Sequence, residues 1–188
     1  MELEKLIAEN QIKLEDIPHI ELYMDQVIQL FENAFASTTR NEEEKVLTKT
    51  MINNYAKGKL FFPVKNKKYS KEHLILIALI YQLKGALSIN DIKSLLNGVN
   101  TGTEEGKMDL DHFYELYLDL TKRNVDAFKN DLENQAGRAA EEVKGLNEDQ
   151  SAELEKVLLA SSLVHMSNLY RKAAERIVDD LKNEGDHK

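Results

Sequence analysis

The sequence contains no cysteine and no tryptophan, and only two prolines occur among its 188 residues. Without cysteine the chain cannot form a disulfide, a thiolate zinc site or an iron–sulfur cluster, and it has no thiol nucleophile. No apolar run approaches the ~20 residues that a membrane-spanning helix needs. The acidic start, residues 1–5, lacks the basic and apolar stretches of a signal peptide. We therefore expect a cytoplasmic protein with no membrane partner.

Enzymatic motifs are lacking as well. The five histidines are scattered, and there is no HExxH pattern, no phosphate-binding glycine loop and no spacing that indicates a Ser/His/Asp triad. Asp111, Glu115 and Asp119 would share a helix face, but a solvated acidic helix start explains them better than a metal site. For His165 we favour a hydrogen-bonded interior position, with an effector pocket as the alternative. We predict no enzymatic activity, no cofactor and no metal.

The residues that are abundant favour helices. Leucine, glutamate, lysine and alanine dominate the sequence, and all four are good helix formers. With 31% charged and 42% hydrophobic residues, the composition is that of a globular protein. We therefore predict a mainly α-helical fold.

Positive charge is concentrated in the middle of the chain, although the net charge of the whole chain is -8. Residues 45–93 contain ten lysines and only two acidic residues, whereas the segments on either side are acidic. Clustered lysines bind a polyanion because they neutralise phosphates and release counterions. This pattern favours a nucleic-acid partner, and a solvated lysine-rich surface is the alternative.

Glycine and apolar periodicity predict the domain organisation. Three of the eight glycines fall within residues 97–106, which predicts a linker over residues 98–107. Before it we expect one domain, residues 1–97, with its core at residues 17–97. After it, over residues 108–188, apolar residues recur every three or four positions in two long stretches. This spacing predicts a long antiparallel helical hairpin.

Helix-start signals are spaced along the first domain. Pro18 predicts the first turn of a helix over residues 19–35, where the missing N–H group of proline costs nothing. A short amphipathic helix is predicted over residues 2–12. Ser70 and Ser88 have side chains that cap helix N-termini, and the helix after Ser70 is strongly apolar.

The basic segment contains a candidate DNA-binding helix that starts at about Glu43 or Thr48 and ends at about Lys57. Residues three or four apart are neighbours on a helix, so threonine, asparagine and lysine form an exposed row while Ile52 and Tyr55 can point inward. Such a row suits the major groove, where asparagine pairs with adenine and lysine reaches guanine or phosphate. Residues 61–69 are predicted to form a β-hairpin with lysines at its tip. The predicted DNA-binding residues are Thr48, Lys49, Thr50, Asn53, Asn54, Tyr55, Lys57, Lys59, Lys65, Lys67, Lys68 and Tyr69.

Part of this segment resembles the MerR family of DNA-binding proteins. The MerR-type pattern of a threonine-led recognition helix followed by Gly-Leu and a proline is matched by Thr50-Met51, Gly58, Leu60 and Pro63. Residues 68–96 resemble that family's exit from the wing and its next two helices. The resemblance implies a winged helix-turn-helix with a small basic β-hairpin wing. It departs at Ile52, where MerR-type helices usually have an arginine that meets the DNA backbone.

A closer resemblance covers about residues 17–97. Residues 17–20, 22–27 and 44–55 are similar to an uncharacterised bacterial family, domain of unknown function 1836. The resemblance implies a bacterial cytoplasmic protein and provides no established activity.

Three functional hypotheses follow from these features. The first is a transcriptional regulator that binds double-stranded DNA as a homodimer, with the C-terminal hairpin used for dimerisation, for sensing a small-molecule effector, or for both. The second is a helical protein-interaction module that has lost DNA binding, which the isoleucine at position 52 and the acidic total favour. The third is a ligand sensor with a pocket between the hairpin and the apolar helix near residues 74–83.

Overall fold

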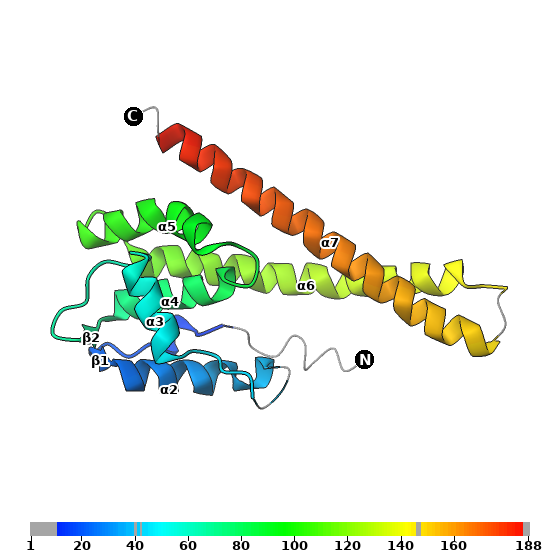
Figure 1. Ribbon diagram of the computed structural model, residues 1–188, viewed down its shortest axis with the longest axis horizontal. Helices are drawn as coiled ribbons and strands as arrows, with labels where there is room; N and C mark the ends of the chain where they lie inside the picture. The colour runs from blue at the N-terminus through cyan, green and yellow to red at the C-terminus, as the bar shows by residue number, and fades with distance from the viewer. Residues whose placement is uncertain (1–10, 40, 42, 146–147, 186–188) are drawn as a thin grey trace. The chain divides into compact units, whose positions relative to one another are not determined.

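The computed structural model describes residues 11–39, 41, 43–145 and 148–185 (Figure 1). By its internal contacts the chain divides into two compact units, residues 1–119 and 120–188. The predicted mainly helical fold is confirmed, with one small two-stranded antiparallel sheet among the described residues. None of the described helices is long and apolar enough to cross a membrane.

The elements follow one another mostly as helices, with two short 3-10 helices (η) near the start. Their bounds are η1 Leu14–Asp16, β1 Leu22–Tyr23, α2 Met24–Phe35, η2 Ala36–Thr38, α3 Lys49–Lys57, β2 Lys68–Tyr69, α4 Lys71–Leu83, α5 Ile89–Glu104, α6 Leu110–Glu142 and α7 Glu148–Gly185. The helix α6 begins in the first unit and continues into the second.

Helix α4 is the centre of the first unit. Its residues from His73 to Ile80 are all buried, so the helix has no solvent-facing side over two turns. A helix that is apolar all round is surrounded by other elements. The buried residues of the elements around it include Val27, Phe31, Phe35, Ile52, Tyr55, Ile92 and Leu96. The prediction of a strongly apolar helix after Ser70 is confirmed.

The first long helix starts later than predicted. Helix α2 begins at Met24 rather than at residue 19, because Leu22 and Tyr23 form strand β1 and pair with Tyr69 and Lys68 of β2. The backbone N–H of Tyr23 donates to the side chain of Gln26 at 2.9 Å, which closes the new N-terminus. Pairing with a strand more than forty residues away therefore overrides the local signal of Pro18. The helix predicted over residues 2–12 lies outside the described residues except for its last two, which are not helical.

The linker predicted over residues 98–107 is helical as far as Glu104, because α5 continues through two glycines. Each glycine costs a helix about 1 kcal/mol relative to alanine. Burial of Ile92 and Leu96 and the capping of the N-terminus by Ser88 compensate for this cost. Two residues after Glu104 the chain turns away at Gly106, which has a φ of +66°, and the N–H of Lys107 donates to the carbonyl of Gly102 at 2.8 Å.

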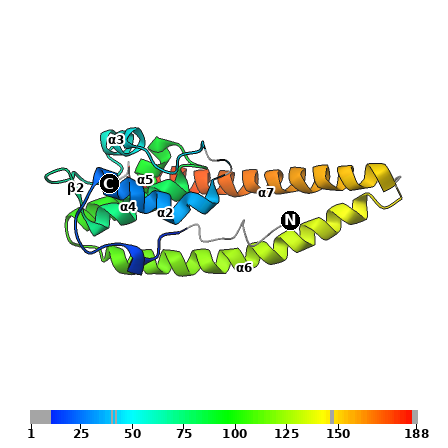
Figure 2. The same ribbon diagram turned by 90° about the horizontal axis from the view of Figure 1, so that it is seen from below.

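The second unit contains most of α6 and all of α7, two long helices that run in opposite directions (Figure 2). The hydroxyl of Ser162 donates to the side-chain oxygen of Gln135 at 3.0 Å, which ties the two helices together. The interior position expected for His165 is wrong, since this side chain is exposed on α7. Ser162, one turn earlier on α7, makes the hydrogen bond to α6 in this stretch.

Candidate nucleic-acid interface

Helix α3 presents the predicted polar row to solvent. The hydroxyl oxygen of Thr48 accepts the N–H of Met51 at 3.2 Å and starts the helix. Ile52 and Tyr55 are buried on the inner side. The remaining row is exposed and consists of Lys49, Thr50, Asn53, Asn54 and Lys57. The amphipathic pattern of this helix is therefore confirmed, with its polar side chains on the exposed side.

One lysine of this row already has a partner. The ammonium group of Lys49 lies 2.8 Å from a carboxylate oxygen of Asp25 on α2, and both side chains are well exposed. An exposed ion pair contributes only about 0–1 kcal/mol. Asp25 therefore offsets the charge of Lys49 locally, and the lysine can exchange it for another anion at little cost.

The end of α3 is a tight turn. The N–H of Lys59 donates to the carbonyl of Ala56, and that of Leu60 to the carbonyl of Tyr55, each at 3.0 Å. This pattern places Lys59 in the left-handed region, with a φ of +57°. Gly58 is needed for a different reason, because a Cβ atom there would lie 2.6 Å from the Cδ1 atom of Leu60.

Residues 65–68 form a basic β-turn, which we call the basic turn. The N–H of Lys68 donates to the carbonyl of Lys65 at 2.9 Å. The two central residues, Asn66 and Lys67, have φ values of 52° and 59°, the signature of a type I′ turn. Lys65 and Lys67 are exposed, whereas the ammonium group of Lys68 lies 4.0 Å from Glu21.

The predicted hairpin over residues 61–69 is only partly present. The sole pairing within it is a single bridge between Lys65 and Lys68, and no strand includes residues 61–64. The return strand β2 pairs with β1 instead, in the register Leu22 to Tyr69. The basic turn is therefore anchored by the pairing of β2 with β1, the strand that precedes α2, and not by a strand formed from residues 61–64.

The two tyrosines among the predicted DNA-binding residues belong to the core. Tyr55 and Tyr69 are only 3% and 4% exposed, so their side chains do not face solvent. Burial raises the pKa of Tyr55 to about 12 and also raises the pKa of Tyr69. The phase of α3 and the pairing of β2 turn both rings inward. The remaining predicted residues are exposed or half-buried.

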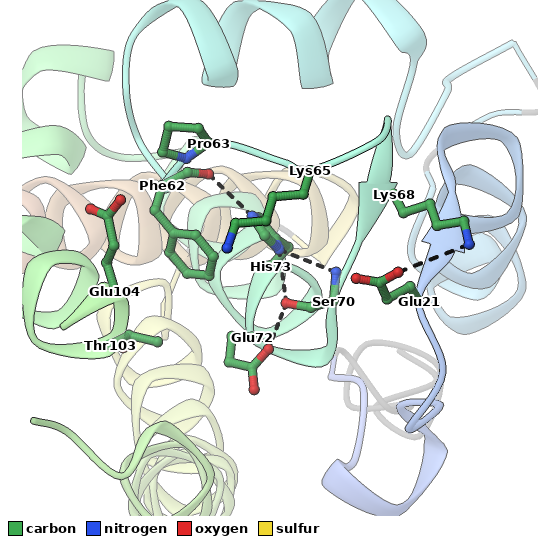
Figure 3. Close-up of a pocket in the computed structure, with 10 residues that line it drawn as sticks. All are labelled: Glu21, Phe62, Pro63, Lys65, Lys68, Ser70, Glu72, His73, Thr103 and Glu104. Carbon is green, nitrogen blue, oxygen red and sulfur yellow. Dashed lines mark hydrogen bonds and ion pairs between the residues drawn. The ribbon is translucent and has the colours of Figure 1, made fainter. Parts of the chain in front are cut away.

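A residue that the sequence reasoning did not select, His73, lies directly behind the basic turn (Figure 3). It is the third residue of α4, and its ring nitrogens hydrogen-bond to Phe62 and Ser70 on opposite sides of the turn. The detectable signal is the spacing Ser70-x-x-His73. A side-chain acceptor at this position closes a capping box, a role usually filled by glutamate or glutamine.

No candidate metal cluster occurs in the part of the chain that the structure describes. In the acidic series predicted to share a helix face, Asp111 accepts a hydrogen bond from Lys71 at 2.6 Å. This ion pair links α6 to α4 within the first unit.

A family model for a domain of unknown function, DUF1836, matches residues 12–117. The chain belongs to this family. The match extends from the described N-terminal segment to the start of α6 and thus covers nearly all of the first unit. The family resemblance stated from the sequence is confirmed, and its extent is greater than the sequence indicated. No curated protein and no solved structure matches the chain significantly.

Proposed function

We propose that this DUF1836 protein is a transcriptional regulator that binds double-stranded DNA through a MerR-like winged helix. The observation that supports it most directly is the exposed row on α3, with Thr50, Asn53 and Asn54 outward and Ile52 buried beneath them. In the proposed complex this row faces base edges in the major groove. The basic turn serves as the wing, and its lysines contact phosphates.

Two lysines in a left-handed backbone conformation support the same assignment. The non-glycine residues with positive φ in the described chain are Lys59, Asn66 and Lys67, and all lie in the basic segment. This conformation costs a lysine about 1–2 kcal/mol, whereas asparagine adopts it more readily. Strain of this kind concentrates at functional sites. Glycine would be more stable at these positions, so the presence of lysine is explained if its positive charge contacts DNA phosphates.

The second unit provides a surface for the proposed homodimer. On α7 the side chains of Leu154, Val157, Leu158 and Val164 are 42–61% exposed and recur at helical spacing. A second copy of the chain would cover this stripe by pairing the two hairpins. A two-fold dimer would place two α3 helices about one DNA turn apart on a palindromic site. Leu158→Glu is expected to shift the sedimentation mass from dimer to monomer.

Fluorescence anisotropy with the protein's own promoter fragment tests the DNA-binding proposal. Each lysine–phosphate contact adds about 0.9 to the slope of log affinity against log salt. Lys65, Lys67 and Lys68 changed together to glutamine are expected to lower this slope by about 3. The matched control changes three exposed lysines of the second unit, Lys122, Lys156 and Lys172, to glutamine. Equal slopes for the two triple variants would contradict the proposal.

A helical protein-interaction module is the alternative function. It is favoured by Ile52, which is fully buried at the position where MerR-type helices use an arginine on the DNA backbone. Charge reversal of the three lysines of the basic turn separates the two functions. It abolishes DNA binding under the first and leaves partner binding intact under the second. A small-molecule effector remains a prediction for either case, and neither requires an enzymatic activity.

A further inference from the structure

We propose that His73 is a positioning residue for the basic turn and that its protonation loosens the turn and weakens DNA binding. The part that concerns DNA rests on the function proposed above. The part that concerns the turn can be tested without DNA.

One imidazole holds both ends of the segment that contains the turn. The Nε2 atom of His73 lies 3.1 Å from the carbonyl oxygen of Phe62, at the end that enters the turn. Its Nδ1 atom lies 3.1 Å from the backbone nitrogen of Ser70, at the end that leaves it. Figure 3 shows the ring between these two partners. A movement of His73 therefore affects both ends of the basic turn.

The two hydrogen bonds require the neutral ring. Because the carbonyl of Phe62 can only accept, Nε2 must have the hydrogen and donate it. Because the backbone N–H of Ser70 can only donate, Nδ1 must accept and therefore has no hydrogen. A proton added at Nδ1 would leave two donors facing each other.

The surroundings of the ring are tightly packed. His73 is buried, and its ring centroid lies 4.1 Å from that of Phe62 and 6.0 Å from that of Tyr69. The ring contributes to the wall of a cavity of about 400 Å³ beneath the basic turn. Charged groups face this cavity from every neighbouring element, namely Glu21 before β1, Lys65 and Lys68 from the turn, Glu72 from α4 and Glu104 from α5.

Burial lowers the pKa of His73, and this effect outweighs the bond to Phe62 and the charges of Glu72 and Glu21, which raise it. The neutral ring is thus favoured in the folded state at neutral pH. The folded ring therefore takes up a proton only at a pH below the ordinary histidine pKa of about 6.5. The window in which the turn responds lies below that pH.

Protonation would exchange one hydrogen bond for another. The hydroxyl oxygen of Ser70 lies 2.8 Å from Nδ1 and also 2.5 Å from a carboxylate oxygen of Glu72. A protonated Nδ1 can therefore donate to this hydroxyl oxygen, whose own O–H already donates to the carboxylate of Glu72. The backbone N–H of Ser70 then loses its acceptor. The backbone at the end that leaves the basic turn is then no longer held by the ring, and only the Ser70 side chain stays bound to His73 and Glu72.

The DNA test compares wild type with His73→Gln between pH 8 and pH 5.5 at constant ionic strength, by anisotropy with the promoter fragment. Glutamine can still accept the Ser70 N–H as a capping-box residue, but it does not titrate. Wild-type affinity is expected to fall about fivefold more than that of the variant, the factor for loss of the one hydrogen bond that fixes the backbone of the turn at Ser70. Any pH effect from groups other than residue 73 is common to both proteins and cancels. Parallel pH profiles would overturn the proposal.

The test without DNA measures hydrogen exchange at the Lys68 amide, which donates to Lys65 within the turn. After correction for intrinsic exchange rates, protection in wild type is expected to fall about fivefold as His73 titrates, again the factor for one hydrogen bond. This measurement needs no variant that must fold. Constant protection through the titration refutes the role of His73, even if DNA is bound. If protection falls but the protein binds no DNA at any pH, the role of His73 in the turn is supported. In that case the proposed DNA-binding function is refuted.

Discussion

Replacement of Lys67 by glycine is expected to stabilise the fold and to weaken DNA binding at the same time. Lys67 is the second central residue of the basic turn and has a φ of 59°. Asn-Gly is a preferred pair at the centre of a type I′ turn, because glycine adopts positive φ freely. Relief of the left-handed conformation gains about 1–2 kcal/mol. The greater backbone freedom of glycine in the unfolded chain returns about 0.5–1 kcal/mol.

The net stabilisation is therefore about 0.5–1 kcal/mol, which corresponds to a rise in Tm of about 1–4 °C. Urea unfolding followed by circular dichroism measures it. Lys67→Ala is the matched control, because it removes the charge but keeps a side chain at positive φ. In the DNA assay both variants lose one cation, and the salt slope of each is expected to fall by about 0.9.

Two results would refute the reasoning. If Lys67→Gly is no more stable than Lys67→Ala, the turn does not have the left-handed conformation described above. If both variants keep the wild-type salt slope, Lys67 contacts no phosphate. The two readouts are independent, so a failure of one leaves the other meaningful.

Three further predictions concern the core around α3 and α4. Ile52→Arg, which introduces the MerR-type arginine, is expected to destabilise the fold by roughly 3 kcal/mol or more, because it buries an unpaired charge. Urea unfolding measures this loss, with Ile52→Val as the control. A stable variant with tighter DNA binding would contradict the prediction. Gly58→Ala is expected to cost about 1–3 kcal/mol, because its Cβ atom would lie 2.6 Å from a Leu60 methyl group; a neutral effect on Tm would show that Leu60 can move away. Because the pKa of His73 is lowered in the folded state, stability is expected to be full above pH 6.5 and to fall as the pH drops below it; unchanged pH dependence of unfolding in His73→Gln would exclude this source.

Most helices were predictable from short stretches of sequence. Thr48, Ser70 and Ser88 each precede a helix at the residue where the structure starts it. The two long helices of the C-terminal half follow their apolar spacing within a few residues. In these segments the helical preference and the burial pattern agree, so neighbouring residues contain enough information.

The candidate site was predictable only in its exposed part. The outward row on α3 follows from helical phase, and the lysines of the basic turn follow from composition. The inward position of Tyr69 depends on pairing between β1 and β2, which no local pattern indicates. The predicted linker failed for a related reason, since α5 passes through glycines that local preference alone would treat as breaks.

The sequence by itself determined the helical class, the starts of the helices after Ser70 and Ser88, the basic middle segment and the family to which residues 12–117 belong. Only the tertiary structure decided that the chain before α2 becomes a strand and that His73 joins the two ends of the basic turn. The physical reason is the separation along the chain between the residues that interact. Helix signals act between residues three or four apart, whereas strand pairing and the bond from His73 to Phe62 join residues that meet only when the chain has folded.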